Sequence, residues 1–249
     1  GIWLGLAGLC RPSTLASAVL SALAGLIFGP GSRRQRIGRT LAMGAMVILV
    51  LAPWAARNAQ VFGEPVWTTT HGGYTLALAN NPEYYRNVLN GPPGSVWTGP
   101  SQRVWAERLY RSLKGLNEPE GDRHIRHQTM AFLREHPRDF LRASAARLSR
   151  FWGLAPAGAV YSWPIRWATF AWTLPFWASV AISLRSRRLW AWPAAACLAQ
   201  VAALSLVHTV FWTDLRMRAP VIPALALMAA HAGLGSAKSN PESETKKNP

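Results

Sequence analysis

The chain has 249 residues, of which 50% are hydrophobic and only 15% are charged, and its formal net charge is +16 at pH 7. Ordinary soluble domains carry about 25% charged residues, so this composition indicates a non-aqueous environment and excludes a disordered chain or a collagen. Nucleic-acid binding is disfavoured, because the positive charge is carried mostly by Arg residues that flank apolar runs, without a Lys-rich stripe or zinc-finger spacing.

The first apolar stretch, residues 2–10, is too short to span a membrane and lacks a basic n-region, so we do not interpret it as a signal peptide. It predicts a truncated helix, and we expect the chain to be the C-terminal part of a longer protein. Cys10 and Cys197 both lie in apolar runs, so neither a disulfide nor a metal site is predicted.

Five later runs contain no Asp, Glu, Lys or Arg: 12–32, 40–56, 167–184, 189–213 and 219–237. Their lengths match the roughly 20 residues that a helix needs to cross a bilayer. The charge-free stretch 65–82 is polar and loop-like, and should not span. We therefore predict an all-α, polytopic transmembrane helix bundle of about five full spans plus the truncated first helix, with a large, mainly helical external segment.

The short links predict the orientation, because Lys and Arg are retained on the cytoplasmic side. Links 30–39 and 185–188 are rich in Arg and belong inside. The expected organisation is a truncated helix and hairpin over 1–56, an extracytoplasmic segment over 57–162, three spans over 163–235 and a disordered cytoplasmic tail over 236–249. The expected location is a bacterial inner (plasma) membrane.

The external segment contains three helical patterns, over 101–115, 122–135 and 138–152. The last one places Phe140, Leu148 and Trp152 on one face, with Arg147 and other arginines elsewhere, which is typical of an interfacial helix. Its arginines would then meet lipid phosphates. An ordinary amphipathic helix packed on a soluble subdomain is the alternative.

Charged residues at the external ends of the spans are the candidate site. The candidates fall in three clusters: Arg11, Arg57 with Asn58, and Asp214 with Arg216 and Arg218. Each arginine alone is more typical of a helix-end anchor than of a binding site. Their convergence on one face favours a phosphate site, because Arg forms bidentate, always-charged contacts.

Several short motifs resemble the second half of GT-C membrane glycosyltransferases of the protein O-mannosyltransferase and aminoarabinose-transferase type. They are Pro53-Trp54-Ala55-Ala56-Arg57-Asn58, Val61-Phe62-Gly63, Thr70-His71-Gly72-Gly73-Tyr74, Asn80-Asn81-Pro82 and the break at Arg11-Pro12. The turn 214–223 is similar to the family's last external loop, which commonly reads Arg-Tyr-Arg, although Met217 stands here in place of the Tyr.

The resemblance implies sugar transfer from a polyprenyl-phosphate donor to an acceptor on the extracytoplasmic face, with the catalytic carboxylate in an N-terminal half that this chain lacks. No catalytic residue is assigned to this chain, which we expect to be inactive alone. Arg11, Arg57, Arg216 and Arg218 would bind the lipid phosphate, with Asn58 and Asp214 orienting them. Tyr74, Asn80 and Asn81 are weaker candidates for the substrate side, and equally typical of turn-forming residues.

The predicted partners are membrane lipid, the polyprenyl-phosphate sugar and an unidentified acceptor, without nucleic acid. No cofactor or metal site is predicted, and the metal requirement stays open. A transporter is disfavoured because the spans carry no ionisable group near mid-bilayer. A non-catalytic membrane assembly protein with an external interaction domain is the main alternative.

Overall fold

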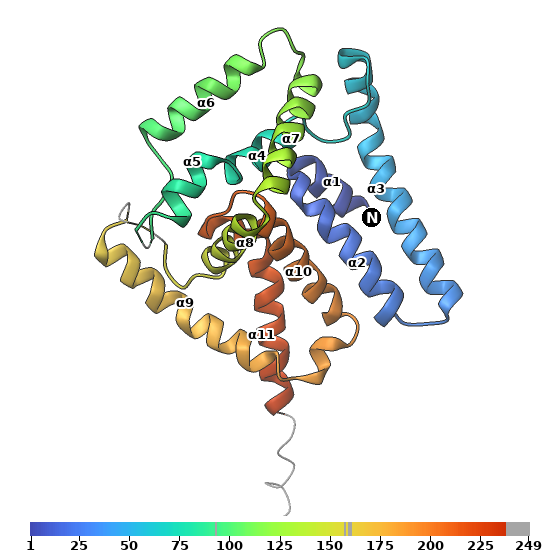
Figure 1. Cartoon of the computed structure of the whole chain (residues 1–249). Helices are drawn as coiled ribbons and strands as arrows, with labels where there is room; N and C mark the ends of the chain where they lie inside the picture. Colours follow the sequence, from blue (N-terminus) through green and yellow to red (C-terminus); the bar gives the residue numbers. More distant parts are fainter. Residues whose placement is uncertain (93, 157, 159–160, 238–249) are drawn as a thin grey trace, which may run out of the picture.

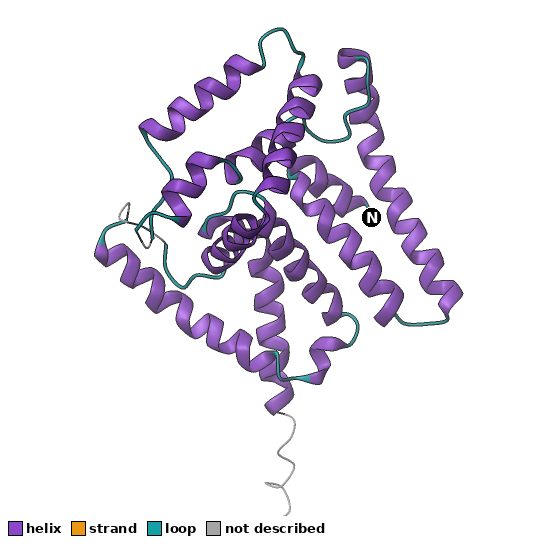
Figure 2. Ribbon diagram, in the orientation of Figure 1, coloured by secondary structure: helices purple, strands orange, loops and turns teal. Residues whose placement is uncertain are grey.

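The computed structural model describes residues 1–92, 94–156, 158 and 161–237 (Figure 1). Helices make up 78% of it, and the described residues form no strand (Figure 2). The prediction of an all-α fold is therefore confirmed. The predicted tail lies almost entirely outside the described residues.

The N-terminal part consists of α1 (Ile2–Cys10), η1 (Pro12–Thr14), α2 (Leu15–Phe28) and α3 (Arg33–Phe62). Arg11 separates α1 from η1 in an extended conformation (φ −149°, ψ 101°), and Pro12 opens the next turn, as the sequence predicts. Ser32 and Gln35 form a capping box at the start of α3, and Gly63 ends it with φ 76°, a left-handed conformation that favours glycine.

The middle of the chain forms α4 (Gly72–Ala79), α5 (Pro82–Tyr84), η2 (Tyr85–Leu89), α6 (Pro100–Ser112), α7 (Glu118–Glu135) and α8 (Pro137–Phe151). Helices α6, α7 and α8 lie where the sequence predicts them. The expectation of a loop over 65–82 is wrong for 72–79, because α4 buries Ala77 against the aromatic core formed by Tyr84, Tyr85, Trp97 and Trp105.

The last part comprises α9 (Trp163–Ser183), η3 (Arg187–Trp190), α10 (Ala194–Val210), η4 (Leu215–Val221) and α11 (Ile222–Ala237). Phe151 at the end of α8 is fully buried with Leu189, Leu204, Val221 and Leu225, so this part packs on α8. Helix α10 also packs along α2, which joins the N-terminal hairpin to the C-terminal helices.

Among the described residues, α3 alone is long and apolar enough to cross a membrane. The apolar helices Pro12–Phe28 and Ala194–Val210 are shorter than the charge-free runs from which they were predicted. Gly29 leaves the helical conformation (ψ 152°) and thereby ends α2 before its charge-free run ends, whereas α10 starts only after Pro193. The helix positions are thus confirmed, whereas length and composition support one membrane-spanning helix instead of five.

Candidate functional site

A cavity of about 710 Å³ lies where the N-terminal helices meet α4 and the end of α10. We call it the Arg11 pocket. Arg11 and Pro12 form one wall, Thr69 and His71 a second, and α10 with η4 closes the third side. Most of its accessible lining is apolar, and no Asp or Glu lies among the described residues that line it.

Arg11 is the cation of this pocket. Its Nε donates to the Ser13 hydroxyl at 3.1 Å, and its Nη2 lies 2.9 Å from the Met217 sulfur. A thioether is a weak acceptor, and no carboxylate among the described residues pairs with this arginine. The guanidinium therefore keeps most of its capacity to bind an anion. The contact with Met217 also brings η4 next to the Arg11-Pro12 break.

His208 of α10 lines the same pocket and is only 4% exposed. Its Nδ1 lies 3.1 Å from the Trp212 carbonyl oxygen, which only accepts, so Nδ1 carries a proton in this contact. The Nε2 atom is buried and has no hydrogen-bond partner within the described part of the chain. The ring stacks on Phe151, with centroids 5.1 Å apart, so its orientation is fixed. Sequence reasoning assigned no site role to His208, since a lone histidine in an apolar run carries no distinctive signal.

The loop between α3 and α4 supplies the wall that contains Thr69 and His71. Two side chains of α3 hold this loop from below: Trp54 Nε1 donates to the Thr68 carbonyl at 2.8 Å, and Asn58 Nδ2 donates to the Val66 carbonyl at 2.7 Å. Asn58 is 2% exposed, and its Oδ1 accepts from Arg57 Nη1 at 3.0 Å. Arg57 also lies over the Trp54 ring, 5.3 Å from its centroid. The predicted pair Arg57 and Asn58 thus anchors the loop and does not line the pocket.

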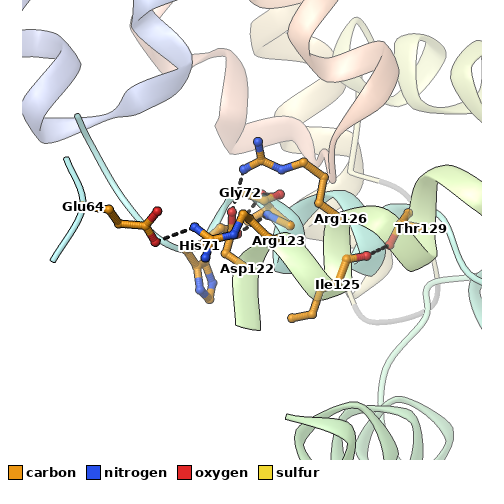
Figure 3. A network of polar contacts seen from close by, with 10 residues as sticks. Glu64, His71, Gly72, Asp122, Arg123, Ile125, Arg126 and Thr129 are labelled. Carbon is orange, nitrogen blue, oxygen red and sulfur yellow. Dashed lines mark hydrogen bonds and ion pairs between the residues drawn. The ribbon is translucent and has the colours of Figure 1, made fainter. Parts of the chain in front are cut away.

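A second set of contacts holds the same loop on α7 (Figure 3). Asp122 accepts a hydrogen bond from the Gly73 backbone N–H through Oδ1, while its Oδ2 pairs with Arg126 Nη2 at 2.6 Å. Arg123, one residue further along α7, pairs with Glu64 at the start of the loop. A Cβ at Gly73 would overlap the Asp122 carbonyl oxygen. Gly73 is therefore required for the close approach of α4 to α7, which fixes the position of His71.

The turn 214–218 places its two predicted arginines in different environments. Asp214 caps η4, accepting from the Arg216 backbone N–H at 3.0 Å and pairing with Arg216 Nε at 2.9 Å. The Arg216 side chain is 80% exposed and does not line the pocket. Arg218 is buried: its Nη1 donates to the carbonyls of Phe151 and Gly153, at 3.3 and 2.5 Å. Arg218 therefore holds the end of α8.

The weaker substrate-side candidates lie apart from the Arg11 pocket. Asn80 is 2% exposed, and its Nδ2 donates to the carbonyls of Leu76 and Val210. Asn81 caps α5 by accepting from the Tyr84 backbone N–H at 2.8 Å. Both asparagines thus act in turn and helix-end formation. Tyr74 lies against His71, 4.6 Å between ring centroids, and its pKa is raised by burial and by the neighbouring Tyr110.

Arg147 on α8 departs from the prediction that the arginines of that helix meet lipid phosphates. Its side chain is 0% exposed, so it cannot meet lipid phosphates. The guanidinium donates to the Ala79 carbonyl at 2.7 Å, the Thr209 carbonyl at 2.8 Å and Asn80 Oδ1 at 3.2 Å. Burial lowers the pKa of Arg147 and raises that of the neighbouring Tyr85 to about 12. Through these hydrogen bonds Arg147 joins α4, α8 and α10.

The chain matches no known protein family, and no curated protein or solved structure shows a significant similarity to it. Function is therefore inferred from the geometry of the Arg11 pocket and from the sequence motifs.

Proposed function

We propose that this chain is part of an integral membrane glycosyltransferase that uses a polyprenyl-phosphate sugar, and that the Arg11 pocket receives the phosphate. The observation that carries this proposal is the unneutralised Arg11 guanidinium in a largely apolar cavity of about 710 Å³. A cation beside apolar walls complements a ligand that joins a phosphate to a hydrocarbon chain.

The proposed topology keeps the sequence-based bundle, with α2, α3, α9, α10 and α11 as spans. The apolar window of α3 is only 6% buried, which separates it from the core helix of a soluble protein. Large apolar side chains are exposed on other helices as well, among them Trp172 on α9 and Leu227 on α11. In Figure 1 the α2–α3 and α9–α10 connections lie at the lower end and α4 to α7 at the upper end, in keeping with Arg-rich links on the cytoplasmic side.

In the proposed sugar transfer, the main task of this chain is to bind the phosphate. A glycosyl phosphate carries a good leaving group, so a cation that stabilises the departing phosphate assists the reaction without an acid. The acceptor hydroxyl needs a general base. No carboxylate lines the pocket among the described residues, and the family that the motifs resemble carries this base in its N-terminal half. Arg11 is the phosphate-binding residue in this scheme, and the Asp214–Arg218 turn closes the pocket through Met217.

Binding of a short-chain polyprenyl phosphate to the purified chain in lipid nanodiscs tests the proposal, with the unphosphorylated polyprenol as the control ligand. Arg11→Gln should weaken binding of the phosphate by about tenfold or more, the usual loss for a hydrogen bond to a charged group. Arg103→Gln, which removes an exposed arginine of α6, is the matched control and should leave binding unchanged. Equal affinity for the polyprenol, or equal losses in both variants, would contradict the proposed phosphate site and favour a non-catalytic assembly role.

A further inference from the structure

A second cavity, about 340 Å³, lies at the opposite end of the N-terminal hairpin. We call it the Arg36 cavity. Ser21 of α2, Arg36 and Arg39 of α3 and Trp192, just before α10, contribute to its wall. It shares no lining residue with the Arg11 pocket. The role proposed above for that pocket therefore does not account for this cavity.

Two guanidinium groups are held in place at this cavity. Arg36 Nη1 donates to the carbonyls of Leu26 and Ile27, at 3.0 and 2.8 Å, and Arg39 Nη1 donates to the Pro30 carbonyl at 2.8 Å. The two Arg36 bonds satisfy carbonyls at the end of α2, which have no donor within their own helix, and the Arg39 bond satisfies a carbonyl of the turn that follows. Carbonyl oxygens do not neutralise a charge, and neither arginine forms an ion pair with a described carboxylate. The cavity is therefore lined by two uncompensated positive charges.

Two buried polar atoms in the same wall lack an acceptor. Ser21 Oγ and Arg36 Nε are both inaccessible, and neither has a hydrogen-bond partner among the described residues. Buried side-chain donors are rarely left unpaired in folded proteins. An anionic group with several oxygens at the cavity would supply acceptors to both atoms after a small adjustment of the two side chains. The missing group is thus an acceptor with negative charge, which is the chemistry of a phosphate.

The surroundings of the cavity indicate which phosphate. Leu23 and Ile27 on α2 and Leu41 on α3 are 46%, 63% and 68% exposed, so the helices on both sides present apolar surface. The cavity also lies at the start of α3, the helix that is long and apolar enough to cross a membrane. Basic pockets between membrane helices at the cytoplasmic side are typical sites for anionic lipid head groups.

We propose that the Arg36 cavity binds the phosphate of an anionic phospholipid, whose acyl chains follow the exposed apolar faces of α2 and α3. Arg36 Nε and Ser21 Oγ donate to the phosphate, and Arg39 supplies further positive charge. The bound lipid would fix the α2–α3 turn against the segment that contains Trp192, joining the hairpin to the C-terminal helices.

The test uses the purified chain in detergent micelles that contain equal mole fractions of phosphatidylglycerol and phosphatidylcholine, with bound lipid counted by native mass spectrometry. We expect phosphatidylglycerol to be retained in preference. Ser21→Ala should weaken its retention by about tenfold, as expected for a lost hydrogen bond to a charged group, without lowering the thermal stability of the lipid-free protein. Arg39→Gln should weaken retention by about fivefold, the usual effect of one basic residue near an anionic lipid. Arg33→Gln removes the same charge from the same turn without lining the cavity, and should leave retention unchanged.

Four results would overturn the proposal. Equal retention of the two lipids would exclude a site for an anionic head group. An equal loss in Arg33→Gln would assign the effect to diffuse surface charge. Displacement of the lipid by millimolar inorganic phosphate would identify free phosphate as the ligand. Lower lipid-free stability of Ser21→Ala with unchanged lipid retention would assign Ser21 to packing alone.

Discussion

Replacing Arg147 by Met tests whether α8 is held by a buried arginine or lies on lipid. The change removes the donors to the Ala79 carbonyl, the Thr209 carbonyl and Asn80 Oδ1, at 2.7, 2.8 and 3.2 Å. Asn80 Oδ1 keeps the Tyr85 hydroxyl as a donor at 3.2 Å, so two carbonyls are left unpaired. Each buried unpaired acceptor costs about 1 to 3 kcal/mol, which amounts to about 2 to 6 kcal/mol for the two. Met recovers part of this cost because it need not desolvate a charge. We expect the free energy of unfolding to fall by about 2 to 3 kcal/mol.

For a chain of this size, such a loss lowers the unfolding temperature by about 4 to 12 °C. Tryptophan fluorescence during heating in a fixed detergent measures it. Arg138→Met on the same helix is the matched control, because Arg138 is exposed, and its effect should stay within about 0.5 kcal/mol. Similar unfolding temperatures for the two variants would refute the buried-arginine interpretation and restore the lipid-facing one.

Two further predictions concern the walls of the Arg11 pocket. Gly73→Ala should destabilise the protein by about 1 to 3 kcal/mol, because its Cβ would overlap the Asp122 carbonyl oxygen and overpack the α4–α7 contact. Gly44→Ala is the control and should not destabilise the protein, because a Cβ there meets nothing within 4 Å. Equal unfolding temperatures for the two variants would contradict this contact. Arg218→Gln should lower the free energy of unfolding by about 1 to 3 kcal/mol, because it leaves the carbonyls of Phe151 and Gly153 unpaired. Arg216→Gln, at an 80% exposed side chain, should change it by less than about 0.5 kcal/mol. The reverse order in a urea unfolding series would show that the roles of the two arginines are assigned wrongly.

The helices were predictable because their signals are local. Ser32 with Gln35, Gly63 and Pro137 mark helix ends through capping and backbone geometry, and the apolar runs between charged residues locate the hydrophobic helices. Helix α4 was not predicted, because the polar residues around it give the stretch the pattern of a loop. The segment is short, and its helical conformation depends on its packing. Its stability depends on Asp122, which is 49 residues away from Gly73 in the sequence. Local patterns carry no information on such a contact.

The candidate site was predictable only in part. The break at Arg11-Pro12 is a local feature, and the structure places it in the wall of the Arg11 pocket. The participation of His208 and Met217 depends on where α10 and η4 pack, which no short motif encodes. The separation of Arg216 from Arg218 likewise depends on the end of α8, which lies more than 60 residues earlier in the chain.

The positions of the buried and half-buried arginines give a physical reason for part of the large positive charge. Arg147 donates to carbonyls at the ends of α4 and α10, and Arg218 to carbonyls at and just beyond the end of α8. The α2 end is satisfied in the same way at Leu26 and Ile27. The last four carbonyls of a helix have no partner within it, and a guanidinium with five fixed donors satisfies several at once, which an ammonium group does less well. In such a chain a positive charge at a helix end is by default structural.

Arg11 departs from this pattern, because its guanidinium faces a cavity and a weak sulfur acceptor instead of helix-end carbonyls. The missing strong acceptor, more than the charge itself, is the reason why we propose Arg11 as the residue that binds the polyprenyl phosphate.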